Sequence, residues 1–358
     1  MLDQAGLVLP GERAAGTAGQ SSRAVRTWLF AVAALILVMV IVGGATRLTE
    51  SGLSITEWKP VTGVLPPLND ADWQAAFAAY KQIPQYAALH ADMTLSGFKT
   101  IYAWEWGHRL LARLIGLVFV LPALWFWRRG ALKGALGRQV LVATAFLALE
   151  PIVGWWMVSS GLVDRVEVAQ QRLAIHLLIA AATYGALIYA AVGVGRRPAG
   201  RVAAGFAAFA AAAFAGLVFV QLGLGALVAG LRAGLIDNTW PLMSGRWLPE
   251  GLFGLTPWFA SLVDDPTTTQ FDHRLVAYLV VVMALLQVVA AWRAQPASPL
   301  ARRAAALALL ALAQAALGIA TLLAVVPIDL ALAHQGLALI LWGAAVAHWR
   351  AIGLERTR

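Results

Sequence analysis

Long apolar runs separated by polar connections make up most of this sequence. Eight of these runs contain roughly 18 to 28 residues, and about 20 helical residues suffice to cross the hydrocarbon core of a bilayer. The pattern therefore predicts an all-α integral membrane protein with eight transmembrane helices. The predicted helices cover residues 27–46, 107–127, 139–160, 172–194, 204–231, 273–292, 303–325 and 329–348.

The polar connections differ sharply in charge, which predicts how the chain is oriented. The two chain ends and the connections after the second, fourth and sixth helices together hold 16 Lys and Arg residues against Asp3, Glu12 and Glu355. Cytoplasmic connections carry an excess of basic residues, so we expect both termini inside. Residues 1–26 lack an apolar run and are predicted to be a disordered cytoplasmic tail. A mitochondrial transit peptide is the alternative, which the two acids near the N-terminus disfavour.

The two remaining long connections, 47–106 and 232–272, are predicted to be outer loops, and their sequences repeat. Gly52, Leu53, Trp58 and Gly63 align with Gly234, Leu235, Trp240 and Gly245 at an offset of 182; His108 and Arg109 match His273 and Arg274; Glu150 and Gly154 match Gln314 and Gly318. We therefore predict two pseudo-symmetric four-helix bundles, 27–194 and 204–348. Four helices per repeat give both copies the same orientation, so an axis along the membrane normal should relate them.

Composition supports the membrane class and removes several kinds of chemistry. Of the 358 residues, 60% are hydrophobic and 13% are charged, which is too apolar for a soluble domain. The chain has no cysteine, so disulfides, thiolate metal sites and iron–sulfur clusters are excluded. The net charge of +9 reflects mainly one side of the membrane, and it does not indicate an acidic partner such as nucleic acid.

Four histidines lie near the start of even-numbered predicted helices: His108, His176, His273 and His334. These helices run inward, so the four imidazoles should share one depth near the outer surface. The second and fourth helices of a bundle are usually diagonal neighbours, so each half could place two imidazoles on opposite sides of a haem iron. The alternative for any single histidine is an ordinary core or interfacial position. His90 and His348 have no counterpart in the repeat and are interpreted as structural.

Zinc is the main alternative to haem iron. Zinc sites prefer closely spaced ligands, often with a carboxylate, and only His108 has such a neighbour, Glu105. Small residues would leave room for a flat macrocycle, although close packing of membrane helices uses the same residues. The glycines in question are Gly154, Gly185, Gly223, Gly225 and Gly318.

An acid distinguishes the two predicted sites. Glu105 lies one helical turn before His108, and the aligned residue in the second half is Gln270, which cannot ionise. We interpret Glu105 as a catalytic carboxylate of the first half. The alternative is an exposed acid that caps the positive N-terminus of its helix, worth about 0.3 to 1 kcal/mol.

Three arginines follow the histidines. Arg109 and Arg274 could hold haem propionates by charge-assisted hydrogen bonds, or could reach lipid phosphates instead. Arg113 lies deeper and should pair with a buried group, for which Glu150 is one candidate.

Several motifs resemble the haem A synthase family, and in particular its proteobacterial and mitochondrial branch. These motifs are SGLSITEWKPVTGVLPP (51–67), GFKTIYAWEWGHRLLAR (97–113), GWWMVSSGL (154–162), RLAIHL (172–177) and FDHRLVAY (271–278). The resemblance runs from about Gly43 to the last helix. The chain departs from the family pattern at Ala112, where glycine is usual, and at Ser96 and Gly97, where an acid is more usual; none of these is a proposed ligand.

The resemblance implies a reaction on haem itself, the oxidation of the C8 methyl group of haem O to a formyl group, which gives haem A for cytochrome oxidases. It implies that His108 and His176 hold the substrate haem, that His273 and His334 hold a haem B cofactor, and that Glu105 is the catalytic glutamate. It also implies the bacterial cytoplasmic (inner) membrane, with surrounding lipid, a haem O synthase (protohaem farnesyltransferase), an electron donor and further copies of the chain as partners.

Two other functions are compatible with part of the pattern. A diheme b-type electron-transfer protein would also need four histidines, but such proteins typically place their ligands at two depths. A transporter could also contain repeats and buried charges such as Glu150.

Overall fold

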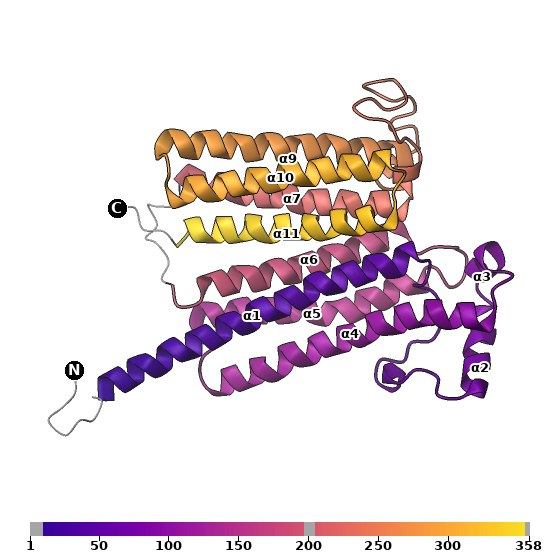
Figure 1. Ribbon diagram of the computed structural model, residues 1–358, viewed down its shortest axis with the longest axis horizontal. Helices are drawn as coiled ribbons and strands as arrows, with labels where there is room; N and C mark the ends of the chain where they lie inside the picture. Colours follow the sequence, from indigo (N-terminus) through magenta and orange to yellow (C-terminus); the bar gives the residue numbers. More distant parts are fainter. Residues whose placement is uncertain (1–9, 197–204, 355–358) are drawn as a thin grey trace.

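Eight long helices dominate the computed structural model, which describes residues 10–196 and 205–354, with side chains from Ser22 onward (Figure 1). They are α1 (Pro10–Leu48), α4 (Leu95–Arg128), α5 (Gly134–Ser159), α6 (Gln170–Gly193), α7 (Gly205–Gly230), α9 (Pro266–Ala294), α10 (Pro299–Leu323) and α11 (Ile328–Ile352). Each contains an apolar stretch long enough to cross a membrane, and no β-strand occurs in the described ranges. The chain is therefore an all-α, multi-pass membrane protein, as predicted.

Most helices begin earlier than the hydrophobic pattern predicts, and α1 and α4 differ most from the prediction. Residues 1–9 of the predicted tail lie outside the described part. Helix α1 starts at Pro10, well before the apolar run begins. The Ala, Glu, Gln and Arg residues there are good helix formers that can extend a membrane helix. Helix α4 starts at Leu95, because Thr94 caps it by accepting a hydrogen bond from the amide of Gly97 (3.2 Å).

Short elements fill the two long loops at one end of the bundle, called the loop end below (Figure 1). They are η1 (Thr62–Val64), α2 (Asp70–Tyr80) and α3 (Pro84–Leu89) in the first loop, and η2 (Ala233–Leu235), η3 (Trp258–Ala260) and α8 (Ser261–Asp264) in the second. Phe98 and Ile101 of α4 are buried in a small core with Phe77 and Tyr80 of α2, so the polar start of α4 is stabilised by the loop above it.

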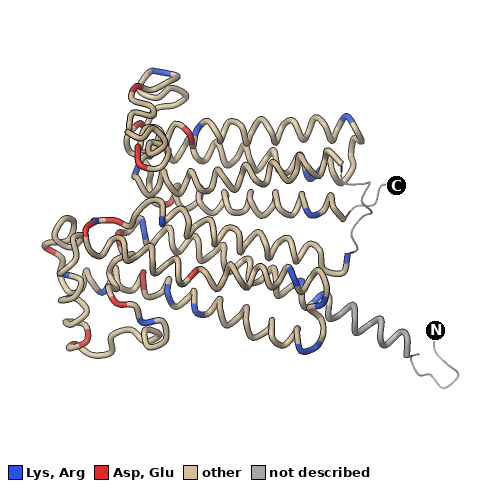
Figure 2. Tube along the Cα trace, turned by 180° about the vertical axis from the view of Figure 1, so that it is seen from behind, with Lys and Arg blue, Asp and Glu red and all other residues tan. Residues whose placement is uncertain are grey.

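Lys and Arg occur at both ends of the bundle, whereas Asp and Glu lie toward the loop end (Figure 2). The opposite end, called the basic end, therefore carries basic residues without acidic ones in the described part of the chain. The basic end contains the connections from α4 to α5 and from α9 to α10. The charge asymmetry read from the sequence is therefore an asymmetry between the two ends of one bundle.

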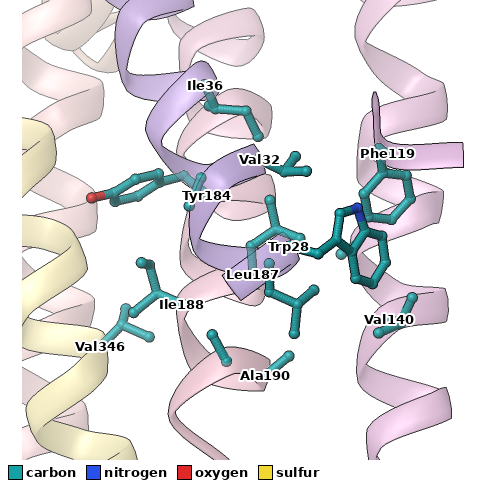
Figure 3. Close-up of a cluster of buried hydrophobic side chains, with 14 of the residues drawn as sticks. Trp28, Val32, Ile36, Phe119, Val140, Tyr184, Leu187, Ile188, Ala190 and Val346 are labelled. Atoms are coloured by element: carbon teal, nitrogen blue, oxygen red, sulfur yellow. The ribbon is translucent and has the colours of Figure 1, made fainter. Parts of the chain in front are cut away.

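Each predicted half has its own apolar core. In the first half, α1 packs against α4 and α6, and α6 packs against α5. Trp28 of α1 lies at the centre of this core and stacks on Phe119 of α4, with ring centroids 5.4 Å apart (Figure 3). In the second half, α7, α9, α10 and α11 form a closed ring around Phe214 and Leu341. Helices α9 and α10 pack closely, whereas their first-half counterparts α4 and α5 do not.

The two halves meet through reciprocal contacts between α6 and α11. A Cβ placed on Gly185 would lie 2.9 Å from Cζ2 of Trp342, and a Cβ placed on Gly343 would lie 2.6 Å from Cε1 of Tyr184. Each half therefore presents an aromatic ring to a glycine of the other, and the Tyr184 ring points toward α11 (Figure 3). The indole of Trp342 also donates a hydrogen bond to the carbonyl of Ala181 (2.8 Å).

A second reciprocal pair of contacts lies beside this interface between the halves, which is called the seam below. Gly336 of α11 faces Ile41 of α1, and Gly223 of α7 faces Leu178 of α6, with added Cβ atoms 3.2 and 3.3 Å from the facing side chains. Equivalent positions contacting each other in this way are consistent with two halves related by a twofold axis. Gly223 and Gly185 thus serve helix packing, which was the alternative to a role beside a macrocycle.

Ionic contacts join the halves at the loop end. Arg232, which begins the second long loop, donates to Glu50 of the first (Nη2–Oε1, 2.8 Å). Glu167, in the connection between α5 and α6, lies 3.4 Å from Arg47 of α1 and also accepts from Arg232. Glu50 and Arg232 occupy equivalent positions, 182 residues apart.

Candidate functional site

All four singled-out histidines rest against a glycine of a neighbouring helix. They project from α4, α6, α9 and α11, the helices that begin at the loop end. Cβ atoms placed on Gly43, Gly154, Gly225 and Gly318 would lie 3.1 Å from Nε2 of His108, 3.2 Å from Cε1 of His176, 3.2 Å from Cε1 of His273 and 2.7 Å from Cε1 of His334. Few real Cβ atoms come so close to another atom, so glycine is what lets each imidazole lie where it does.

The residue one turn before the glycine faces the same imidazole at three of the four sites. Oε2 of Glu150 lies 2.7 Å from Nδ1 of His176. In the second half, the amide nitrogens of Gln221 and Gln314 lie 3.1 and 3.0 Å from Nδ1 of His273 and His334 respectively. Both amides also donate to the backbone carbonyl of the same histidine, at 2.9 and 3.0 Å.

At the fourth site, that of His108, the residue one turn before the glycine is Met39, which precedes Gly43. Sequence reasoning aligned Glu150 with Gln314 but missed Gln221 and Met39. The signal was present, because Met39 and Gln221 are separated by the same 182 residues as the matching loops.

The imidazoles of the second half face each other across the bundle. The ring centroids of His273 and His334 are 6.4 Å apart, and the ring planes are inclined by 81°. Metal–imidazole bonds of about 2 Å on each side would account for about 4 Å of this separation, and the two ring radii account for the rest. The pair therefore fits two axial ligands of one haem iron.

Zinc is not supported as the metal. Within residues 10–196 and 205–354, no three His, Cys, Asp or Glu side chains converge on one point. The carboxylate beside His108 in sequence is also engaged elsewhere. Haem iron needs only two protein ligands, and the facing imidazoles of His273 and His334 suit that number.

Glu105 is buried, with 3% of its surface exposed, so the alternative of an exposed helix-capping acid is wrong. Its Oε2 accepts hydrogen bonds from the hydroxyl of Ser54 and the amide of Ile55, both 2.7 Å long. Its Oε1 accepts from Nη2 of Arg109 at 2.6 Å. The carboxylate thus joins α4 to the first long loop at the level of the histidine pair.

Gln270, the counterpart of Glu105, is also buried and also contacts the loop of its own half. Its amide nitrogen donates to the carbonyl of Asp237 at 2.9 Å. The two sites therefore share a geometry and differ in chemistry, since an ionisable carboxyl group stands in one and an amide, which cannot ionise, in the other.

The arginines after the histidines hold the loops. Arg109 donates to the carbonyls of Ile55 (3.0 Å) and Glu57 (3.2 Å). Arg274 donates to the carbonyls of Asp237 (3.0 Å) and Thr239 (2.8 Å), which are the equivalent loop positions. A contact with haem propionates stays a prediction for both guanidinium groups.

Arg113 also binds the first loop, through the carbonyls of Lys59 (3.0 Å) and Pro60 (2.9 Å). The predicted pairing with Glu150 is wrong, because Glu150 lies against His176. Hydropathy alone could not reveal this, since it does not show that the loop descends over α4.

The two remaining histidines lie apart from the glycine series. Nδ1 of His90 is 2.6 Å from the hydroxyl of Tyr80, whose pKa is raised by burial, and Nε2 is 3.5 Å from Glu50. His348 is buried near the basic end of α11. Neither faces another of the six histidines in the manner of His273 and His334.

Comparison with known proteins identifies the family. Residues 26–346 match the family model described as "Cytochrome oxidase assembly protein". A protein of Rhodopseudomonas palustris named "Heme A synthase" is 53% identical over 292 residues, 81% of this chain and 79% of its own length. Proteins of the same name from Beijerinckia indica and a Bradyrhizobium species are 52% and 51% identical over 76% of the chain, and 77% and 74% of their own lengths. The chain belongs to the haem A synthase family of cytochrome oxidase assembly proteins.

Proposed function

We propose that this protein is a membrane oxidoreductase that converts haem O to haem A by oxidising the C8 methyl group to a formyl group. Family membership and the names of its relatives support this reaction. The observation that carries the proposal for this chain is the pairing of two similar histidine sites, only one of which has a carboxylate beside it, Glu105 opposed to Gln270.

In this proposal, His108 and His176 hold the substrate haem, and His273 and His334 hold a haem B cofactor. A substrate must enter and leave, whereas a resident cofactor need not. The packing supports this assignment, because α9 and α10 close the second half while α4 and α5 leave the first half less enclosed.

Glu105 is proposed as the catalytic group. The hydrogen bonds from Ser54, Ile55 and Arg109 fix the carboxylate one helical turn before His108. A fixed negative charge at this place can stabilise positive charge that develops on the substrate carbon, or it can orient a water molecule. Gln270 carries no negative charge and cannot accept a proton, in keeping with a half that retains its haem unchanged.

The proposed function also suggests where the protein lies and which proteins it works with. The basic end is proposed to face the cytoplasm, which places the histidine sites toward the outer side of the bacterial inner membrane. Haem O is proposed to come from a haem O synthase, and electrons are proposed to be exchanged with a separate donor protein. Assembly of several copies also remains a proposal.

A diheme electron-transfer protein is the second candidate. All four histidines lie in the loop-end parts of their helices, which disfavours two haems stacked at different depths. Formation of a formyl-bearing haem from haem O would separate the two functions, because an electron carrier would leave the macrocycle unchanged.

The test is to reconstitute the full chain with haem O and a reductant and to detect formyl-bearing haem by mass analysis. We expect Glu105→Gln to lower its formation by about 100-fold, a typical loss for a positioned acid–base group. Ser54→Ala is the matched control, because it removes one hydrogen bond to the carboxylate but leaves the charge. Unchanged product with Glu105→Gln would refute the catalytic role, and an equal loss in both variants would assign Glu105 to loop anchoring.

A further inference from the structure

We infer that Glu150 makes His176 a stronger donor to iron than any other histidine of the two sites, so that the first half holds its haem at the lower reduction potential. This inference rests on the proposed function and names a positioning residue for it. Glu150 has no proposed contact with the methyl group that reacts. It acts through the imidazole of His176, which it faces.

Glu150 lies within ion-pair distance of His176. The carboxylate oxygen Oε2 lies 2.7 Å from Nδ1. Nδ1 of His176 has no aligned hydrogen-bond partner, so the carboxyl group acts on the ring through its charge and not through a hydrogen bond. A negative charge this close to an iron-binding imidazole favours positive charge on the ring and on the metal that it holds.

Nothing else in the neighbourhood accounts for an acid at this position. Among the described residues, Glu150 forms no ion pair with Arg or Lys, and its second oxygen, Oε1, is buried without a hydrogen-bond partner. A carboxylate inside a membrane helix costs on the order of 2.5 kcal/mol or more, so a helix without a use for it would be more stable with an apolar residue.

The second half provides an internal comparison. Gln314 occupies the position of Glu150, and its amide nitrogen lies 3.0 Å from Nδ1 of His334 while donating to the carbonyl of the same residue. Gln221 has the same arrangement with His273. Neutral amides therefore face both imidazoles of the second half, and a carboxylate faces one imidazole of the first.

The difference in charge predicts a difference in potential. A more basic axial imidazole donates more electron density and favours the ferric over the ferrous state, so it lowers the reduction potential. A haem bound beside Glu150 should thus be easier to oxidise than the haem between His273 and His334.

The test is a potentiometric titration of the full chain with haem B in the second half and haem O in the first, followed by optical and electron paramagnetic resonance spectra. We expect Glu150→Gln to raise the midpoint potential of the first-half haem by about 59 mV, which is a tenfold change in a one-electron equilibrium. The reciprocal variant, Gln314→Glu, should lower the potential of the second-half haem by a similar amount.

The two variants keep the inference separable from the proposed function. If Glu150→Gln binds haem O with two histidines but leaves its potential unchanged, the inference fails and the function stands. If Glu150→Gln binds no haem O, the reciprocal variant decides, since an unchanged second-half potential in Gln314→Glu would overturn the inference. If the unmodified chain binds haem O in neither half, the proposed function fails first.

Discussion

Each of the four proposed iron ligands is a histidine whose imidazole lies against a glycine of a neighbouring helix. A side chain on that glycine would occupy the space that the ring needs. The ring and its glycine belong to different helices, so the position of each histidine depends on how two helices pack. Gly225, for example, lies on α7 and faces His273 on α9. The position of a histidine found in the sequence therefore follows only once the helix that carries its glycine is known.

We predict that Gly225→Ala displaces His273, because the new methyl group would lie 3.2 Å from Cε1 of the ring. The expected result is loss of low-spin bis-histidine haem from the second half, seen as a weaker α band in the absorption spectrum. Gly216→Ala is the control, since Gly216 lies on the same helix with no atom within 4 Å of the added methyl group. Equal spectra for both variants would contradict the role of Gly225.

Part of the site could be predicted from the sequence. The four histidines, Glu105 and the match of Glu150 with Gln314 all follow from the repeat and from the cost of polar groups in a membrane. The hydrogen bonds of Glu105 could not be predicted, because they come from Ser54 and Ile55, about 50 residues earlier. Contacts of this kind depend on how a loop folds back over a helix, which hydropathy does not encode.

At the scale of elements, each long loop is attached to a membrane helix by the arginine that follows a histidine. In the second loop, Asp237 completes this attachment, accepting hydrogen bonds from Thr239 (3.0 Å from its amide) and Ser244 (2.8 Å). Burial acts to raise the pKa of Asp237, but the bonds from Thr239 and Ser244 outweigh it, so the pKa lies below its usual value. The folded loop thus favours the ionised acid.

Asp237 should therefore stabilise the second loop in a pH-dependent way. A group with a lowered pKa stabilises the fold above its ordinary value, here 3.8, and that contribution disappears as the pH falls through the lowered pKa. We predict that Asp237→Asn makes the loop more sensitive to limited proteolysis at neutral pH, by about 1 to 3 kcal/mol of local stability. Resistance equal to that of the unmodified chain at pH 7 would contradict this expectation. Below pH 3.8 the difference between the two proteins should shrink.

The number and order of the membrane helices could be predicted from hydropathy, but most of their starting points could not, those of α1 and α4 least of all. Residues 95–106 look like loop because they are polar, yet they form the first three turns of α4, with Phe98 buried against α2. Hydropathy detects membrane spans, and it does not detect a helix that continues beyond the span into a folded loop.

At the scale of the whole molecule, the halves interlock through aromatic rings set against glycines. We predict that Gly185→Ala lowers the free energy of unfolding by about 1 to 3 kcal/mol, the usual cost of overpacking, because its methyl group would lie 2.9 Å from Trp342. Thermal unfolding in detergent measures this, with Gly216→Ala as control. Both variants add the same helix-favouring methyl group, so a difference between them reports the seam, and equal stability would contradict its importance.

The ionic contact at the loop end should couple the halves weakly. Glu50 and Arg232 are partly exposed, with 31% and 46% of their side chains accessible, so their pairing should contribute only about 0.2 to 1 kcal/mol. A double-mutant cycle with Glu50→Gln and Arg232→Gln should give this coupling at low salt and a smaller value at high salt. Strictly additive effects at low salt would show that the contact is not formed in solution.

The lack of close packing between α4 and α5 bears on how an apolar product can leave the protein. In a bilayer, lipid would lie beside the helices on this flank, because α4 and α5 do not close it as α9 and α10 close the second half. A haem with a long isoprenoid chain could then leave sideways between α4 and α5 while its tail stays in an apolar phase.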